Sequence, residues 1–405
     1  MKILLLTQLF QPEPAHIRGL KFAKALIEAG NEVEVLTGFP NYPNGKIYQG
    51  YNIRLFQREI IDGVPIVRVA LYPSHDQSGV RRFLCYVSFA LMASLLGLFL
   101  MKRPDVVFIC QGPATIVLPA MVFKWIVGAP YVLDVQDIWP ESVTESGMFK
   151  ANYLLPFLHA WCSLSYRFSE KIIVLSEGYK ALLLKRGVRT KKIHVVYNWC
   201  DEELKHFHDG HDRFNLSGYF NIIYAGTMGK IQALEYVIDA ASILQKEIPH
   251  VQFVFVGGGT EVDHLIKYAF AKNVNNVRFI PRQPINEIGG ILALADILLI
   301  HLKDNPLGRI GIPQKTQAYM AAGKPILMAV AGDAASLVER ADAGIVCKPE
   351  DPVSISNAIR KSLAQAPEEL KIMGDNGSRY YSKQLSFTKG LTKIQDIFRK
   401  AIMDS

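Results

Sequence analysis

Short apolar segments alternate with helix-like segments along most of the chain, and no other feature limits the possible folds as strongly. A first series comprises KILLL (2–6), EVEVL (32–36), PIVRV (65–69), DVVFIC (105–110), YVLDV (131–135), KIIVL (171–175) and HVVY (194–197). A second comprises NIIYA (221–225), VQFVFV (251–256), VRFI (277–280), ADILLI (295–300), PILMAV (325–330) and GIVC (344–347). Nearly continuous apolar strands with helices between them predict βαβ units, in which a parallel sheet is buried on both faces.

The two series are separated by the polar stretch 201–218, DEELKHFHDGHDRFNLSG. This predicts an α/β protein of two doubly wound, Rossmann-like domains, at 1–200 and 219–385, joined by a linker at 201–218. The length of 405 residues also fits two domains. A last helix, at 386–405, lies beyond the second series, and we expect it to cross back and pack on the N-terminal domain.

The composition narrows the class of protein. Hydrophobic residues make up 50% of the chain and charged residues 20%, which excludes a disordered or fibrous protein. The net charge of +8 suits polyphosphate ligands, nucleic acid or an anionic membrane surface. Because the basic residues form no arginine-rich stripe, we expect no nucleic acid among the partners.

The chain has five dispersed cysteines and no C-x-x-C pair: Cys85, Cys110, Cys162, Cys200 and Cys347. An odd, scattered set argues against a disulfide framework and against a zinc site, and it is typical of a protein in the reducing cytoplasm. The N-terminal apolar run, Ile3 to Leu6, is too short for a signal peptide.

One segment departs from the alternation, because 83–101 contains no charged residue while basic pairs flank it at 81–82 and 102–103. Its length just reaches the threshold of about 18 residues for crossing a membrane. A crossing would place two strands of one sheet on opposite sides of the bilayer, so we exclude it. Two alternatives remain: a helix in the interface of an anionic membrane, and a helix buried in the domain. We expect the first, with the protein peripheral or monotopic at the cytoplasmic face of the inner or plasma membrane.

Glycine-rich turns follow two strands of the second series. GTMGK (226–230) leads from a strand into a helix, so its backbone N–H groups and the helix N-terminus suit a phosphate. VGGG (256–259) follows the next strand. Neither has the G-x-G-x-x-G spacing of a dinucleotide site, so each is either a nucleotide-facing loop or a plain strand–helix turn.

Basic residues come shortly before a helix that we expect to end at Gly323. Arg309 and Lys315 lie beside the turn formed by Gly311 and Pro313. Two cations at a helix N-terminus, next to the carboxyl ends of strands, suit a departing diphosphate. The alternative is a pair of solvated basic residues beside a turn.

In the first half, DVQDIWPES (134–142) places Gln136 and Asp137 directly after a strand. A carboxylate at the carboxyl end of a strand suits the hydroxyl groups of an acceptor, and it equally suits the cap of the next helix. The loop 36–51 is rich in aromatic residues, and its Tyr42 and Tyr48 suit stacking on a sugar or lipid, or packing within the loop.

Several catalytic motifs are absent from the sequence. It contains no H-E-x-x-H, no G-x-S-x-G, no G-x-x-x-x-G-K-[ST] and no D-x-D pair. These absences exclude metalloprotease, serine hydrolase and P-loop sites of the usual kinds, and they leave no paired aspartates for a metal ion.

The order of the motifs resembles glycosyltransferase family 4 over essentially the whole chain. The matching stretches are FQPEPAHIRG (10–19), LTGFPNYPNGKIYQGY (36–51), VQDIWPES (135–142), IVLSEGYK (173–180), YNWCDE (197–202), YAGTMGKIQALE (224–235) and IPQKTQAYMAAGKPIL (312–327). Within the family, the chain is most similar to the bacterial polysaccharide enzymes that include N-acetyl-L-fucosamine transferases. The resemblance implies a GT-B fold, with two domains facing a cleft, and metal-independent transfer that retains the anomeric configuration and needs no cofactor.

The resemblance also implies the two substrates. The donor would be a nucleotide-sugar, expected to be a UDP-sugar, held mainly by the C-terminal domain. The acceptor would be a lipid-diphosphate-linked saccharide on the N-terminal side. We expect the transferred sugar to be an N-acetylated deoxyhexose or a hexosamine, and the pathway to be the assembly of a surface polysaccharide such as O-antigen or capsule.

Some family positions carry other residues here. Ile310 and Ala318 stand where much of the family has the glutamates of a Glu-x7-Glu motif, and we expect Gln317 to replace the ribose contact of the second. Thr227 and Gln232 stand in place of an arginine and a lysine that hold the diphosphate, and Gln136 stands in place of a histidine.

The motifs and the resemblance together predict three sets of residues and no metal ligand. The catalytic set is Asp137, Arg309 and Lys315. The two cations are expected to stabilise the leaving diphosphate, and the carboxylate to orient the acceptor. The donor-binding set is Gly226, Thr227, Met228, Gly229, Lys230, Gln232, Gly258, Arg282, Gln314 and Gln317. The acceptor-side set is Glu13, His16, Arg18, Tyr42, Gln136 and Trp139.

Two other functions remain as alternatives. One is a GT-B UDP-sugar 2-epimerase, which needs carboxylates in its cleft and no lipid-facing helix, so the segment 83–101 argues against it. The other is a non-catalytic subunit that binds a nucleotide-sugar, which the missing glutamates would fit.

Overall fold

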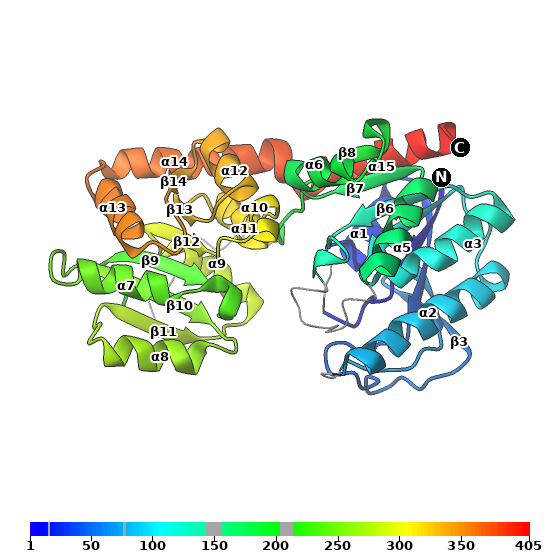
Figure 1. Cartoon of the computed structure of the whole chain (residues 1–405), viewed down its shortest axis with the longest axis horizontal. Coiled ribbons are helices and arrows are strands. Elements are labelled where there is room, and N and C mark those ends of the chain that lie inside the picture. The colour runs from blue at the N-terminus through cyan, green and yellow to red at the C-terminus, as the bar shows by residue number, and fades with distance from the viewer. Residues whose placement is uncertain (15–16, 76–77, 143–154, 203–213) are drawn as a thin grey trace. The chain divides into compact units, whose positions relative to one another are not determined.

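The chain forms two α/β units, each built on its own sheet (Figure 1). This computed structural model describes residues 1–14, 17–75, 78–142, 155–202 and 214–405. One unit comprises Met1–Tyr197 and Leu391–Ser405, and the other comprises Asn198–Gly390. Most of the expected linker, residues 203–213, lies outside the described residues.

In the described part of the first unit, the sheet has eight strands in the order β3-β4-β2-β1-β5-β6-β7-β8. Neighbouring strands are parallel, apart from the antiparallel pair of β3 and β4. The strands are β1 (Lys2–Leu6), β2 (Glu32–Gly38), β3 (Phe56–Ile61), β4 (Val64–Val69), β5 (Val106–Gln111), β6 (Tyr131–Val135), β7 (Lys171–Val174) and β8 (Ile193–Val195). Because helices cover both faces, strands such as β6 are buried along their whole length, as their apolar sequences predict.

The helices of this unit connect the strands. They are α1 (Leu20–Glu28), α2 (Gly79–Leu100), α3 (Val117–Val127), α5 (Leu155–Phe168) and α6 (Glu177–Lys185), with short 3₁₀ turns at Ala114–Ile116 and Thr190–Lys192. The chain runs from β1 outward through β2, then returns to place β5 on the other side of β1. The carboxyl end of β1 is therefore the point where the strand order reverses, which is where open α/β sheets bind ligands.

Of the described strands of the first sheet, only β3 was not predicted by the apolar pattern. It pairs with β4 through a two-residue turn in which Asp62 (φ 49°) and Gly63 (φ 82°) are both left-handed. This Asp-Gly turn is typical of a β-hairpin. β3 was missed because it forms the edge of the sheet, where its residues alternate between exposed and half-buried positions.

Helix α2 contains the apolar segment expected at 83–101 and begins one turn earlier, where the Ser78 hydroxyl accepts a hydrogen bond from the N–H of Arg81 (3.4 Å). In length and composition α2 satisfies the requirements of a membrane-spanning helix. One face is buried in the unit, and a Cβ on Gly97 would lie 2.9 Å from the Leu36 side chain and 3.1 Å from Phe123.

The opposite face of α2 is apolar and exposed to solvent. It presents Val80, Phe83, Leu84, Leu91, Leu95 and Phe99, of which Phe99 is 86% exposed. One face of α2 therefore belongs to the core of the unit, and the other remains exposed.

Within the described residues of the second unit, the sheet has six parallel strands in the order β11-β10-β9-β12-β13-β14. They are β9 (Phe220–Ala225), β10 (Val251–Gly257), β11 (Val277–Pro281), β12 (Ile297–His301), β13 (Ile326–Ala329) and β14 (Gly344–Val346). The strand order reverses at β9, which has β10 on one side and β12 on the other. The core between sheet and helices is formed mainly by β9, β10 and α7, with Tyr224, Phe253 and Phe255 fully buried.

The helices of this unit follow the strands in alternation (Figure 1). They are a 3₁₀ turn at Lys230–Gln232, α7 (Glu235–Leu244), α8 (Val262–Ala271), α9 (Ile285–Ala293), α10 (Pro306–Ile310), α11 (Gln314–Ala322), α12 (Asp333–Ala341), α13 (Pro352–Leu363) and α14 (Pro367–Tyr380). A π-helical turn at Tyr381–Leu385 leads into α15 (Phe387–Met403).

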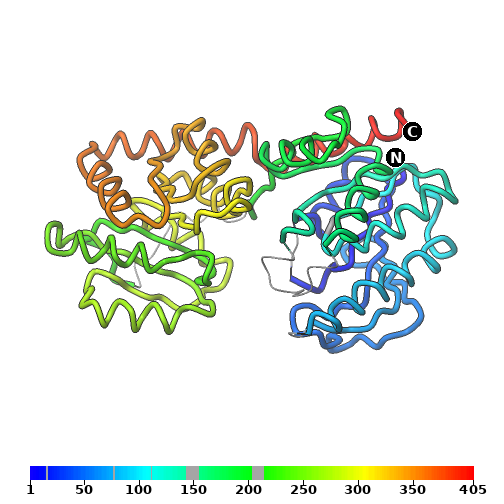
Figure 2. Tube along the Cα trace, in the orientation of Figure 1, coloured from blue at the N-terminus to red at the C-terminus, as the bar shows by residue number. Residues whose placement is uncertain are grey.

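The long helix α15 contributes to both units, and Figure 2 shows both chain ends in the first one. At its start, Phe387 packs edge-on against Trp199, with ring centroids 5.1 Å apart. Beyond Leu391 the helix belongs to the first unit, where Phe398 contacts Phe108 at 5.1 Å and Asp404 pairs with Lys171 at 2.5 Å.

Candidate functional site

Two loops at the carboxyl edge of the second sheet are locked together through their backbones. The N–H of Gly226 donates to the carbonyl of Val256 (2.8 Å), and the N–H of Met228 donates to the carbonyl of Gly258 (2.8 Å). These bonds continue the pairing of β9 and β10 beyond the ends of the strands. Gly257 adopts φ 142°, and a Cβ there would lie 2.1 Å from the carbonyl oxygen of Gly226. Only glycine fits such a close approach between two backbones.

The same loops leave backbone donors unused. Thr227 and Gly258 make no hydrogen bond through their N–H groups to any described residue, and the Cβ side of Gly258 is open space. Both loops lie beside β9, where the strand order reverses. Unused N–H groups at such a point form a site for an anion.

Lys315, the second residue of α11, brings a positive charge to these loops. Its Nζ lies 3.3 Å from the centroid of the Tyr224 ring, and a Cβ on Gly226 would lie 2.6 Å from its Cε. Burial without a compensating carboxylate lowers the pKa of Lys315 to about 7. Among the described residues no acidic side chain pairs with it. A cation held against a glycine loop with no partner of its own is suited to an anionic ligand.

Arg309 lies in a different environment from Lys315. It is the penultimate residue of α10 and forms a bidentate ion pair with Asp304 (2.6 and 2.7 Å), on the surface of the unit. The sequence placed both cations before one helix, whereas the structure places Lys315 within the first turn of α11 and Arg309 on the preceding short helix. The charge of Arg309 is already neutralised by its own neighbour.

Three expected donor residues are used by the protein itself. The side chain of Met228 is buried in the core, and the Oε1 atom of Gln232 accepts the N–H of Gly229 (2.9 Å). Gln317 is 1% exposed, and its amide donates to the carbonyls of Pro313 (2.9 Å) and Gln314 (3.1 Å). This burial argues against the ribose contact expected of Gln317.

Three other expected donor residues are available to a ligand. The side chains of Lys230, Arg282 and Gln314 are exposed, and none makes a hydrogen bond or ion pair with another described residue. Lys230 belongs to the loop after β9, Arg282 to the loop after β11, and Gln314 opens α11.

In the first unit, a buried ion pair connects residues far apart in the sequence. The Nε of Arg18 lies 3.0 Å from Oδ2 of Asp134, and both side chains are fully buried. The Nε2 of Gln136 also donates to Oδ2 of Asp134 (2.8 Å). Desolvation raises the pKa of Asp134, although Arg18 opposes the shift. Sequence reasoning named Arg18 and Gln136 and missed Asp134, because an aspartate inside an apolar strand gives no sign of its partner.

Asp137 lies just beyond β6 and is exposed. Its carboxylate makes no hydrogen bond to any described residue, so it is not a helix cap in the described part, and partial desolvation raises its pKa. Trp139 is nearly buried, and its carbonyl accepts a hydrogen bond from Nη1 of Arg186 (2.9 Å). Asp137 is thus available to a ligand, whereas Trp139 packs in the unit.

Glu13 connects the loops that follow β1 and β2. Its Oε1 accepts the N–H groups of Asn41 and Tyr42 (2.8 Å each), and its Oε2 accepts that of Phe10 (3.1 Å). The side chain is buried, and desolvation raises its pKa. Tyr42 also packs edge-on against His75, with ring centroids 4.6 Å apart. Glu13 therefore shapes this edge of the sheet from within.

The remaining acceptor-side residue, His16, lies outside the described residues. The acceptor-side positions that are described come from loops after β1, β2 and β6. Since these strands are parallel, the loops share the carboxyl edge of the first sheet.

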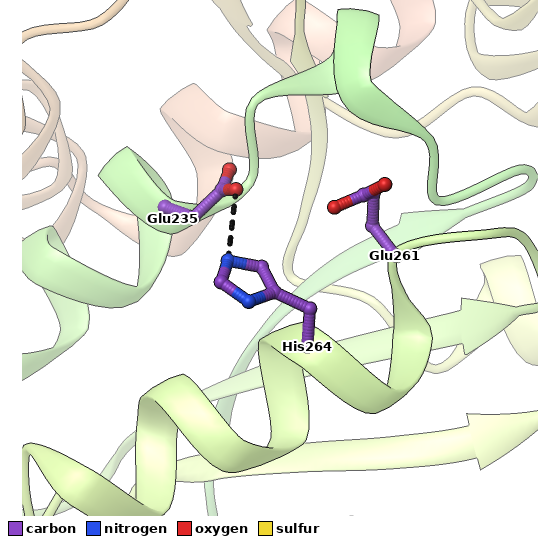
Figure 3. Close-up of side chains that lie close together, drawn as sticks. All are labelled: Glu235, Glu261 and His264. Carbon is purple, nitrogen blue, oxygen red and sulfur yellow. Dashed lines mark ion pairs between the residues drawn. The ribbon is translucent and has the colours of Figure 1, made fainter.

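One cluster in the second unit has the composition of a metal site. Glu235, Glu261 and His264 carry ligand atoms that all lie within 4.8 Å of one another, and it is the only such group in the part of the chain that the structure describes (Figure 3). The Nε2 of His264 lies 3.4 Å from Oε1 of Glu235, and the imidazole is mostly exposed. An ordinary surface ion pair with one acidic neighbour accounts for the grouping.

Two family models match the chain, and each falls in one of its halves. Residues 17–199 match the glycosyl transferase 4-like domain, and residues 211–380 match the glycosyl transferases group 1 domain. Together they cover most of the chain.

Individual proteins give the same picture at low identity. WbjE of Pseudomonas aeruginosa, named as a glycosyltransferase, is 26% identical over 69% of this chain and 73% of its own length. WcaI of Escherichia coli K12, named as a colanic acid biosynthesis glycosyl transferase, is 26% identical over 90% of this chain and 92% of its own. The structure of HepE from Anabaena, in complex with UDP and glucose, is 17% identical with a TM-score of 0.70 and covers 98% of this chain and 99% of that one.

The fold is thus GT-B, with two Rossmann-like sheets and a long C-terminal helix. With both of its halves matched by glycosyltransferase models, the chain belongs to the glycosyltransferases of the family 4 type.

Proposed function

We propose that the protein is a retaining, metal-independent glycosyltransferase that uses a UDP-sugar and acts in surface polysaccharide assembly. The observation that carries the proposal is the position of Lys315, half-buried beside Gly226 without a carboxylate partner among the described residues. The choice of UDP is supported by the HepE complex, and the pathway by the name of WcaI. We infer, from the resemblance alone, that the sugar is an N-acetylated deoxyhexose or a hexosamine.

The chemical step follows from the charge that develops on the donor. As the bond between the anomeric carbon and the phosphate oxygen breaks, a nucleoside diphosphate leaves with an additional negative charge. Lys315 and the N–H groups of Thr227 and Gly258 would stabilise that charge in place of a metal ion. The acceptor hydroxyl attacks the same face of the sugar, and its proton passes to the departing phosphate oxygen.

The acceptor that we propose is a saccharide linked to a lipid diphosphate. Asp137 would orient its hydroxyl group, since its carboxylate is exposed beyond β6 and has no partner among the described residues. The buried pair of Arg18 and Asp134 would hold Gln136 beside it.

A lipid-linked acceptor requires that the enzyme work at a membrane, and we propose that α2 provides the contact. Its exposed face is apolar from Phe83 to Phe99, with Leu95 63% and Phe99 86% exposed. Basic residues at 81–82 and 102–103 flank the apolar part. A helix with this distribution lies in the interface of an anionic bilayer with its free face inserted. The buried face of α2 supports an interfacial position over a crossing.

Transfer is favoured over the two alternative functions, because both family models describe glycosyl transferases. The test is to incubate the purified protein with UDP-sugars, with and without a lipid-diphosphate-linked saccharide, in the presence of a chelator, and to identify products by mass spectrometry. We expect glycosylated lipid to form only when both substrates are present. Epimerised donor in the absence of acceptor, or no turnover with any pair, would contradict the proposal.

A further inference from the structure

His301, the last residue of β12, is buried at the carboxyl edge of the second sheet and bonded through both ring nitrogens. Its Nδ1 lies 2.6 Å from the carbonyl oxygen of Gln232, and its Nε2 lies 3.1 Å from the backbone nitrogen of Glu350. A carbonyl can only accept and a backbone N–H can only donate. The imidazole is therefore neutral, with its proton on Nδ1.

The bond to Gln232 continues into the glycine loop after β9. The Oε1 of Gln232 accepts the N–H of Gly229 (2.9 Å), while the N–H of Gln232 donates to the carbonyl of Gly229 (3.1 Å). One imidazole thus ties the loop 226–232 to the loop that follows β14. On the far side, Oε2 of Glu350 accepts the N–H of Asp304 (2.8 Å), so the loop after β12 joins the same chain of bonds.

The surroundings of His301 maintain the neutral ring. Desolvation lowers the pKa of His301. The bond to Gln232 and the carboxylates of Glu350 and Glu235 favour the charged form, but their combined effect is smaller. The Tyr236 ring stacks on the imidazole, with centroids 6.2 Å apart and planes 21° apart. Protonation of Nε2 would place two donors against each other at Glu350.

We infer that His301 is a positioning residue, which holds the loop 226–232 in the shape that binds the diphosphate of the donor. It touches no substrate itself, and it acts through Gln232 and Gly229 on the loop to which Lys315 is adjacent. This inference rests on the proposed donor site. It goes beyond that site because it makes the conformation of the loop depend on the hydrogen bond that Nδ1 of His301 donates to the carbonyl of Gln232.

Two substitutions separate the two bonds of the ring. His301→Asn places an amide N–H near the position of Nδ1 and preserves the bond to Gln232, whereas His301→Gln reaches the Nε2 position and preserves only the bond to Glu350. We expect His301→Asn to bind UDP within about threefold of the parent and His301→Gln to bind about tenfold more weakly in isothermal titration calorimetry. His250→Gln, on an exposed histidine of the same unit, serves as the matched control.

Equal UDP affinity in His301→Gln and the parent, or equal loss in both His301 variants, would overturn the inference. Lys315→Ala distinguishes this failure from failure of the proposed function. If UDP binding weakens in Lys315→Ala but not in His301→Gln, only the role of His301 is wrong; if it weakens in neither, the donor site is wrong. If His301→Gln does not fold, the long-range ¹H–¹⁵N spectrum of the parent tests the inference by showing which ring nitrogen of His301 carries the proton. A neutral ring with its proton on Nδ1 is expected, and a proton on Nε2 would refute the inference.

Discussion

Among single residues, Lys315 is the one best suited to bind the diphosphate of a donor. A half-buried lysine that packs against Tyr224 and Gly226, with no acidic partner among the described residues, is costly to charge without a ligand. A bound diphosphate supplies the missing counter-charge. The charge of Lys315 should therefore depend on the presence of the ligand.

This dependence predicts how pH affects donor binding. Without ligand the pKa of Lys315 is about 7, and a bound diphosphate raises it, so UDP binding takes up a proton above pH 7. The affinity for UDP should fall by up to about tenfold for each pH unit above 7. In Lys315→Arg the guanidinium stays charged, and this dependence should vanish. Calorimetric titration between pH 7 and 9 measures it, and an equally flat profile in both proteins would contradict the prediction.

A pair of neighbouring glycines tests the packing of the two loops. In Gly257→Ala the new Cβ would meet the carbonyl oxygen of Gly226 at 2.1 Å in a left-handed backbone, whereas a Cβ on Gly258 meets nothing within 4 Å. We expect Gly257→Ala to lower the free energy of unfolding by about 2 kcal/mol or more, and Gly258→Ala to change it little. Urea denaturation compares the two variants, and equal stability would show that the loops are not locked together as described.

The sequence could identify the loops but not the use of each side chain in them. GTMGK and VGGG were recognised because glycine after a strand is a local signal. The burial of Gln317 and the ion pair of Arg309 with Asp304 depend on neighbours brought in by folding, which no local pattern records. For the same reason, Lys315 and Arg309 were equally good candidates on sequence alone, and only the structure distinguishes them.

At the scale of elements, α2 is the feature whose function can be tested directly. Replacement of Leu91, Leu95 and Phe99 by Gln alters only its exposed face, so the fold and UDP binding should be retained. We expect the variant to lose most of its binding to vesicles that contain anionic lipid, in a sedimentation assay. In the control variant, Ile266 and Phe270 of α8 are replaced by Gln. These side chains are also exposed, and the control should bind vesicles as the parent does.

Undiminished vesicle binding by the α2 variant, with its fold intact, would show that another surface makes the contact. Loss of binding together with unfolding would show that this face is needed for the structure. Circular dichroism and thermal melting of both variants distinguish these outcomes.

Most strands were predictable, because a buried parallel strand is apolar throughout and can be recognised without its neighbours. The limits of this rule are visible in β3, an edge strand whose residues alternate in exposure. They are also visible in α2, whose composition is apolar all round while only one face is buried. Which face packs is decided by Leu36 and Phe123, from other elements.

At the scale of the whole molecule, α15 joins two units that the sequence separates. The helix starts in the second unit and contributes its residues from Leu391 onward to the first. Its placement was expected from its position after the last strand. The boundaries at Asn198 and Leu391 follow from packing and lie a few residues away from those expected at 201 and 386.

A substitution in α15 should therefore destabilise the first unit. Phe398 is fully buried and contacts Phe108 of β5, with ring centroids 5.1 Å apart. We expect Phe398→Ala to lower the free energy of unfolding by about 3 kcal/mol, because it leaves a cavity. In hydrogen exchange, the Phe398→Ala variant should lose backbone protection in β5 relative to the parent, while β10 of the second unit should keep its protection. Unchanged protection in β5 would mean that the C-terminal part of α15 does not support this core.

The central claim is that protein groups, and Lys315 above all, stabilise the leaving diphosphate without a metal ion. The most direct measurement is the rate of sugar transfer in chelator-treated buffer by the parent and by Lys315→Ala, with both substrates saturating. We predict that the parent keeps its full rate and that the variant is slower by about 100-fold or more. A parent inactivated by the chelator, or a variant as fast as the parent, would contradict the claim.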